Sequence, residues 1–224
     1  MDDFEEIRLH ASGLAFSALA RGSGPVVLCL HGFPDCNRSF RFQLPALAEA
    51  GFRAIAPTLR GYEPSSQPAD GDYHIVRMAE DVVGQVDDLG GEPVHLVGHD
   101  WGAVIGYAAA VLAPDRFQSL ATLAIPHPGR MRQAIRKLPG QLRNSWYMLF
   151  FQLRGLADRR LEVRDWALIE KLWRDWSPGW EPTPEELAQV KHTLAKPGVK
   201  KAALGYYRAL FGLPSEASRQ TAKL

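Results

Sequence analysis

The alternation of short apolar runs with helical patterns in the first half of the chain limits the fold more than any other feature. Apolar runs short enough to be single strands occur at 25–32, 52–59, 93–100 and 117–127. Between them, 74–91 has apolar residues at three- and four-residue steps, and another helix is expected directly after residue 100. Apolar strands that alternate with helices predict a mostly parallel sheet with helices on both faces, and 7–22 is expected to add an antiparallel hairpin.

The second half of the chain shows helical patterns only. Thr183 and Glu186 have the spacing of a capping box, and the helix that they begin is expected to be followed by another over 200–212, closed by Gly212. The sequence therefore predicts two parts, an α/β core over 1–127 and a helical domain over 128–224.

The distribution of charge changes at the same point. Residues 1–127 contain 8 Lys and Arg against 16 Asp and Glu, whereas residues 128–224 contain 18 against 9, so that the net charge of the whole chain is only +1. Two solvated surfaces of opposite sign explain this better than a phosphate- or membrane-binding basic half. We therefore expect neither nucleic acid nor a membrane as a partner.

Composition and the start of the chain exclude further classes of protein. Hydrophobic residues make up 46% and charged residues 23% of the chain, a balance typical of globular proteins rather than of disordered chains. The acidic start resembles no secretory signal, and no apolar run is long enough to span a bilayer. Cys29 and Cys36 lack disulfide or metal-ligand spacing. A cytoplasmic location and no metal or cofactor are expected.

The segment 98–102 carries the clearest chemical signal. It reads Gly-His-Asp-Trp-Gly and lies where a predicted strand turns into a predicted helix. Small residues on both sides of Asp100 allow the backbone to reverse sharply, and the start of the helix favours an ionised carboxylate. An ionised carboxylate can displace a leaving group from a saturated carbon, which a serine hydroxyl cannot do without a base.

This turn resembles the nucleophile elbow of the α/β-hydrolase fold, with Asp100 where many members have Ser. Two further segments, His-Gly-Phe-Pro-Asp at 31–35 and Arg-Gly-Tyr-Glu-Pro-Ser-Ser at 60–66, resemble loops of the same superfamily, although many members have Gly where Glu63 stands. Together the three motifs resemble the epoxide hydrolase and dehalogenase branch, whose fold places a helical cap over the sheet. The resemblance covers nearly all of 1–127.

The resemblance implies particular roles for site residues. Asp100 would open an epoxide through an alkyl-enzyme ester to give a diol, and the backbone N–H groups of Phe33 and Trp101 would form the oxyanion hole. His31 is expected to hold its loop, and His99 to point away from the pocket as a packing residue. The substrate would be small and hydrophobic, in a pocket expected to be lined by Phe33, Pro34, Trp101 and Phe151.

Two tyrosines in the helical half distinguish branches of the family. Epoxide hydrolases carry two cap tyrosines that hydrogen-bond the epoxide oxygen, and the segments 147–152 and 206–208 resemble the patterns around them. Tyr147 and Tyr207 are the matching positions. A haloalkane dehalogenase would typically have Glu or Asn where Phe33 follows His31-Gly32. Two alternatives stay open, a haloalkane or haloacid dehalogenase and a non-catalytic module that binds hydrophobic ligands.

The family also uses an acid and a histidine that follow the cap, and the sequence offers no candidate for either. We therefore expect a C-terminally truncated chain that lacks the last strands of the core and does not turn over. A second copy of the chain or a separate C-terminal segment would then complete the sheet.

Overall fold

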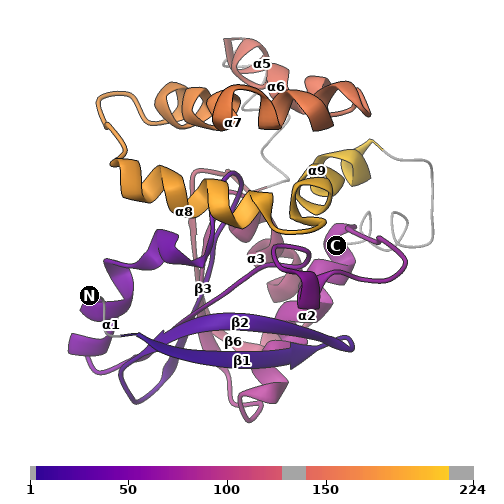
Figure 1. Cartoon of the computed structure of the whole chain (residues 1–224). Helices are drawn as coiled ribbons and strands as arrows, with labels where there is room; N and C mark the ends of the chain where they lie inside the picture. The colour runs from indigo at the N-terminus through magenta and orange to yellow at the C-terminus, as the bar shows by residue number, and fades with distance from the viewer. Residues whose placement is uncertain (1–3, 128–139, 212–224) are drawn as a thin grey trace.

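A computed structural model describes residues 4–127 and 140–211 and contains a six-stranded sheet with helices on both faces (Figure 1). The strand order is β1-β2-β4-β3-β5-β6. The strands are β1 (Glu5–Ala11), β2 (Leu14–Arg21), β3 (Val26–Leu30), β4 (Arg53–Pro57), β5 (Val94–His99) and β6 (Phe117–Leu123). The predicted hairpin is confirmed: β1 pairs with β2 and β2 with β4 antiparallel, whereas β4, β3, β5 and β6 are parallel.

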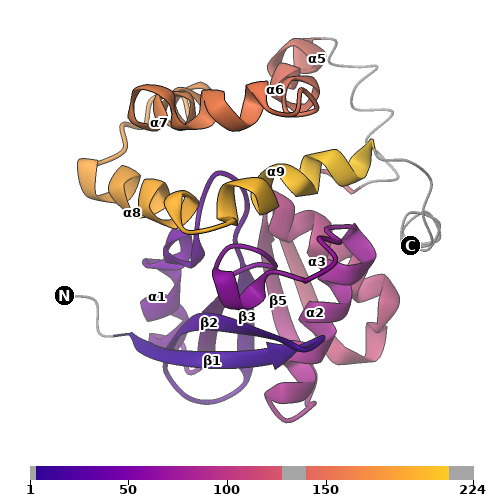
Figure 2. The ribbon, with the colours of Figure 1, turned by 45° about the vertical axis from the view of Figure 1, so that its right-hand side comes forward.

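Helices cover both faces of the sheet, as the apolar strands predict. Along β3, Leu28 and Leu30 belong to the larger core cluster, which includes residues of α2 and α3, whereas Val27 and Cys29 belong to a smaller cluster with α1 (Figure 2). Because successive side chains of a strand point to opposite faces, each face of β3 is buried. These elements are α1 (Gln43–Glu49), α2 (Ile75–Asp88) and α3 (Trp101–Leu112), with 3-10 turns at Asn37–Phe40, Pro64–Ser66 and Pro114–Arg116.

Within the described residues, five helices follow the sheet and form what we call the helical layer. They are α5 (Gly140–Asn144), α6 (Trp146–Phe150), α7 (Leu156–Trp176), α8 (Pro184–Ala195) and α9 (Val199–Leu210). The predicted capping box is confirmed, because the Thr183 side chain accepts a hydrogen bond from the Glu186 N–H and the Glu186 carboxylate accepts one from the Thr183 N–H. The expected stop at Gly212 lies outside the described residues, and the domain boundary after residue 127 stays a prediction.

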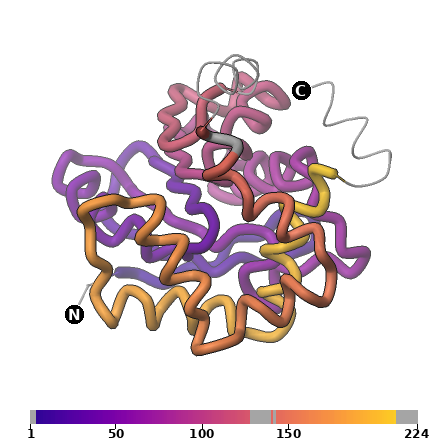
Figure 3. The backbone as a smooth tube through the Cα atoms, turned by 90° about the horizontal axis from the view of Figure 1, so that it is seen from above, coloured from indigo at the N-terminus to yellow at the C-terminus, as the bar shows by residue number. Residues whose placement is uncertain are grey.

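The helical layer lies over one end of the sheet and is tied to it by hydrogen bonds from three of its segments (Figures 1 and 2). The Tyr206 hydroxyl donates to the Arg60 carbonyl at 2.6 Å, and the Trp173 indole N–H donates to the Pro34 carbonyl at 2.8 Å. Gln67 donates to the carbonyl of Pro197 at 2.7 Å. Seen from above, the orange helical segments overlap the indigo strands (Figure 3). The layer therefore covers the loops that follow β3 and β4.

The helices in the described part of the chain are all too short or too polar to cross a lipid bilayer.

Candidate active site

Asp100 lies in a strained turn between β5 and α3. Its φ of 53° and ψ of −117° are unusual for a residue with a side chain. The glycines around it are required by close approach: a Cβ on Gly98 would lie 2.3 Å from the Gly102 carbonyl oxygen, and a Cβ on Gly102 would lie 2.1 Å from the Leu30 carbonyl oxygen. The turn therefore needs glycine at both positions, as the motif predicts, and presents Asp100 at the end of the sheet.

Two backbone N–H groups hold the Asp100 carboxylate. The Phe33 N–H donates to Oδ1 at 2.9 Å, and the Trp101 N–H also donates to the carboxyl group. Burial nevertheless raises the pKa of Asp100 to about 6, because the two donors only partly replace the lost hydration of the charge. The structure thus brings the predicted nucleophile and both predicted oxyanion donors into contact.

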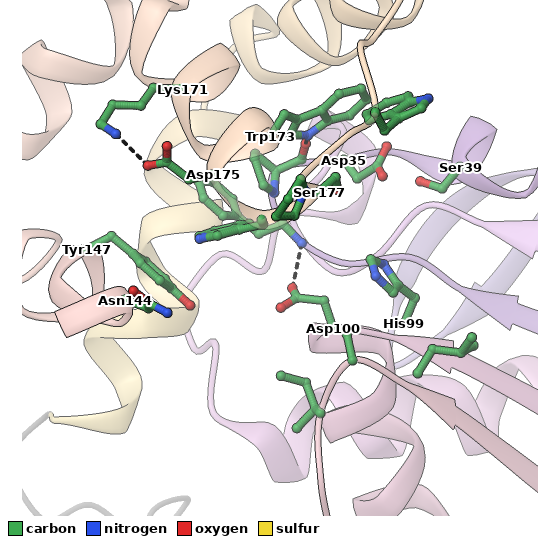
Figure 4. A pocket seen from close by; sticks show the side chains of 18 of the residues that line it. Asp35, Ser39, His99, Asp100, Asn144, Tyr147, Lys171, Trp173, Asp175 and Ser177 are labelled. Atoms are coloured by element: carbon green, nitrogen blue, oxygen red, sulfur yellow. Dashed lines mark hydrogen bonds and ion pairs between the residues drawn. The ribbon is translucent and has the colours of Figure 1, made fainter. Parts of the chain in front are cut away.

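A cavity of about 1180 Å³ opens between the end of the sheet and the helical layer. Asp100, Phe33 and Pro34 line it from the sheet side, and Tyr147 from α6 points into it from the other side (Figure 4). Much of the remaining wall is aromatic, with side chains of Phe42, Trp146, Trp173, Trp176 and Trp180. Polar side chains also line the cavity on its helical side, among them Asn144, Lys171 and Asp175. A partly apolar wall with polar groups suits a hydrophobic molecule that reacts at a polar atom.

Tyr207 lies next to Tyr147, with ring centroids 5.7 Å apart. The Tyr207 hydroxyl is buried near the Trp101 indole and makes no well-formed hydrogen bond to the described residues. Burial and the charge of Asp100 raise the pKa of both phenols, so both stay protonated and can donate. The structure therefore brings the two predicted tyrosines together, with Tyr147 in the cavity wall and Tyr207 buried behind it, where it does not line the cavity.

Two residues expected in the pocket lie behind its wall instead. Trp101 and Phe151 are buried, with exposed fractions of 5% and 0%, and neither lines the cavity. Their rings pack edge-on against Tyr207 at centroid distances of 5.2 and 5.0 Å. This corrects the pocket prediction: both side chains support Tyr207, while the wall itself consists of other residues.

The structure also places polar residues in the cavity wall that the sequence did not assign to it, and two of them lie on the sheet side near Asp100. His99 lines the cavity, although it was expected to point away, and Asp35 lies beside it (Figure 4). Burial raises the pKa of Asp35 to about 6. The position of Asp35 directly after Pro34 in the 31–35 motif was the available signal for it.

The loops behind the site are held by buried polar contacts. His31 is confirmed as structural: Nε2 accepts from the Leu59 N–H at 3.2 Å, and burial lowers the pKa of its ring to about 4. Glu63 accepts from the hydroxyls of Ser17 and Thr58 at 2.7 Å each. These bonds tie the loop that begins at His31 to the segment after β4, and that segment to β2.

No cluster of three or more His, Cys, Asp or Glu side chains within residues 4–127 and 140–211 could hold a metal ion.

Comparison with known proteins agrees with this geometry. The model of the alpha/beta hydrolase fold family matches residues 25–165, which is more than half of the chain. The protein is an α/β hydrolase. The turn at Asp100 joins β5 to α3, and the sheet, with helices on both faces, has the fold that the motifs predict.

Individual relatives of this α/β hydrolase carry the name epoxide hydrolase. Epoxide hydrolase 3 of Siraitia grosvenorii is 39% identical over 175 residues, which are 76% of this chain and 55% of the relative. The AB hydrolase superfamily protein YfhM of Bacillus subtilis is 32% identical over 88% of this chain and 69% of its own. The crystal structure of an epoxide hydrolase from Vigna radiata, 29% identical, superposes with a TM-score of 0.76 over 94% of this chain and 73% of that one. The chain spans just over half the length of the first of these relatives.

Proposed function

We propose that this α/β hydrolase opens small hydrophobic epoxides with Asp100 as the nucleophile and that the helical layer acts as its cap. The observation that carries the proposal is the Asp100 carboxylate, held by two backbone N–H groups at the end of a cavity that Tyr147 enters from the opposite side. The names of the similar proteins support the same reaction class.

The first chemical step forms an ester. One oxygen of the Asp100 carboxylate attacks an epoxide carbon, the bond from that carbon to the epoxide oxygen breaks, and the oxygen takes a proton from Tyr147 or Tyr207. The other carboxylate oxygen becomes the ester carbonyl and stays beside the N–H groups of Phe33 and Trp101. Addition of water to this carbonyl, with one of its protons returning to the phenolate, would place negative charge at those donors. The bond from the carbonyl carbon to the ester oxygen would then break, and that oxygen would take the proton of the added hydroxyl, which gives a diol and regenerates the Asp100 carboxylate.

The experiment that tests this proposal is covalent labelling of the 224-residue chain. Incubation with styrene oxide should add the mass of one substrate molecule, and peptide mapping should place the addition on Asp100. This step uses only groups that the structure describes. A chain that binds styrene oxide without a mass increase or diol formation would instead support the non-catalytic binding module.

A dehalogenase on the same scaffold is the second candidate. Halide release needs N–H donors that face the leaving group, and the Trp101 indole packs against Tyr207 outside the cavity wall. Tyr207 is also absent from the cavity wall, so this placement does not separate the two reactions. Incubation with an alkyl bromide of similar size separates the two, because labelling of Asp100 with release of bromide, and none by the epoxide, would assign the site to halides.

Removal of one of the two phenols, those of Tyr147 and Tyr207, should slow labelling of the chain without preventing it. We expect Tyr147→Phe and Tyr207→Phe each to slow labelling by styrene oxide about tenfold, and the double variant at least about a thousandfold, because each phenol alone can still protonate the opened oxygen. The rate of mass increase measures this. Tyr73→Phe is the matched control, since Tyr73 packs on Tyr206 away from the cavity. Equal rates in the double variant and the wild type would exclude the phenols from the reaction.

The rate of labelling should depend on the ionisation of Asp100. Because burial raises the pKa of Asp100 to about 6, the reactive carboxylate is lost as the pH falls below that value. We expect the rate to fall about tenfold per pH unit below 6 and to level off above it. Asp35 also has a raised pKa of about 6, so the profile should be repeated with Asp35→Asn. If the fall in labelling rate near pH 6 is absent from Asp35→Asn, the group that titrates is Asp35 and not Asp100.

A further inference from the structure

The two segments that carry the phenols also contain a glutamine and an arginine that the proposed reaction does not use. Gln152, which follows α6, donates from its side-chain amide to the Tyr207 carbonyl of α9 at 3.0 Å. In the other direction, Arg208 of α9 donates from Nε to the Phe151 carbonyl at 3.0 Å. The two bonds therefore join the segment that carries Tyr147 to α9, which lies between α6 and the sheet in both side views (Figures 1 and 2).

Asp158 in the first turn of α7 fixes the direction of the Arg208 side chain. The guanidinium donates from Nη1 and Nη2 to the two Asp158 carboxylate oxygens at 3.1 and 2.7 Å, a two-point contact that lysine cannot make. The hydrogen bond from Arg208 lowers the pKa of Asp158 to about 2, so the carboxylate stays charged at neutral pH. A guanidinium held at two points presents its Nε–H to the Phe151 carbonyl in one orientation. We call Gln152, Arg208 and Asp158 the clamp.

Phe151 connects the clamp to the reacting groups. Its side chain is buried, and its ring packs edge-on against Tyr147, Tyr207 and Phe33 at centroid distances of 5.7, 5.0 and 5.5 Å. The N–H of Phe33 in turn donates to the Asp100 carboxylate. A shift of the backbone at Phe151 would therefore move both phenols relative to the nucleophile.

We propose that the clamp positions the two phenols, with Gln152 and Arg208 as positioning residues that do not touch the substrate. This role rests on the proposed epoxide reaction, in which a phenol gives its proton to the opened oxygen. Neither side chain lines the cavity, so both act through Tyr147 and Tyr207. The Tyr207 hydroxyl makes no well-formed hydrogen bond to the described residues, so its place depends on the backbone that Gln152 holds and on the packing of Phe151. Because proton transfer needs hydrogen-bond distance, a displacement of about 1 Å can slow the reaction on the order of a hundredfold.

Labelling by styrene oxide tests the clamp with conservative variants. We expect Arg208→Lys, which keeps the charge but loses the two-point contact, and Gln152→Met, which keeps the shape but has no donor, each to lower the maximal rate of labelling about tenfold. The styrene oxide concentration that gives half of this rate should stay within about twofold of the wild type. In a variant without either phenol, Tyr147→Phe with Tyr207→Phe, the same substitutions should cause no further loss, because no phenol remains to be positioned.

Lys200→Met is the matched control. The ion pair of Lys200 with Glu162 joins the same two helices, α9 and α7, but involves neither phenol nor Phe151. This variant should label at the wild-type rate. Circular dichroism checks that each variant is folded, and if Arg208→Lys is not, Gln152→Met, which changes no charge, carries the test.

The outcomes separate the clamp from the reaction that it serves. Equal slowing in Lys200→Met, wild-type rates in both clamp variants, or the same loss in the variant without phenols would overturn the positioning role and leave the reaction standing. A wild-type chain that gains no label on Asp100 would overturn the proposed reaction and the positioning role with it.

Discussion

Asp100→Asn is expected to abolish labelling of the chain by styrene oxide. The amide has almost the same shape as the carboxylate and can keep the hydrogen bond from the Phe33 N–H, but it lacks the negative charge that attacks carbon. The rate of mass increase should fall by a factor on the order of a thousand or more. Loss of a nucleophile predicts this result even if the substrate still binds, which equilibrium binding of the substrate to the variant would show.

Asp35→Asn is the matched control for this prediction. Asp35 is a second buried carboxyl group that lines the same cavity and has a similarly raised pKa, but its side chain accepts from the Cys36 N–H at 2.9 Å and not from the oxyanion donors. The control should keep its labelling within about a factor of ten of the wild type. Labelling that survives in Asp100→Asn and is lost in Asp35→Asn would move the nucleophile to Asp35.

The sheet and its order of elements could be predicted from the sequence because the central strands β3 and β4 are buried on both faces. Such strands are apolar throughout, and β3, with Leu28 on one face and Val27 on the other, has no polar position that would obscure the pattern. The turn at Asp100 could be predicted for a different reason. At Gly98 and Gly102 the neighbouring backbone lies too close for any Cβ atom. The two glycines of the motif therefore predict the sharp turn.

The wall of the cavity could not be predicted in the same way. Whether an aromatic residue of the helical layer faces the cavity or the packing behind it depends on how helices from distant parts of the sequence lie against one another. Trp101 and Phe151 pack on Tyr207, whereas Trp173 reaches the wall because its indole bonds to Pro34 across 139 positions of sequence. The side on which His99 lies was predicted from the alternation of side chains along a strand. That alternation does not continue into the turn, because the next residue, Asp100, has a positive φ.

Gly102→Ala should strongly destabilise the fold, because among the described glycines an added Cβ would make its shortest contact with backbone at this position. The new Cβ would lie 2.1 Å from the Leu30 carbonyl oxygen and 2.7 Å from the His31 carbonyl oxygen, and both are backbone atoms that cannot turn aside. The start of α3 must therefore move away from β3, at a cost of about 3 kcal/mol. For a chain of this size the midpoint of thermal unfolding should fall by roughly 10 °C, which circular dichroism measures.

Gly140→Ala separates this steric effect from the general effect of replacing glycine in a helix. A Cβ on Gly140 meets no atom within 4 Å, and alanine favours the helix, so the variant should be as stable as the wild type or more stable by up to about 1 kcal/mol. Because α3 carries the Trp101 N–H and β3 leads to the Phe33 N–H, the shift in Gly102→Ala should also separate the two donors from Asp100 and slow labelling by styrene oxide at temperatures where the variant is folded. Wild-type stability and labelling in Gly102→Ala would show that the contact between α3 and β3 does not position the nucleophile.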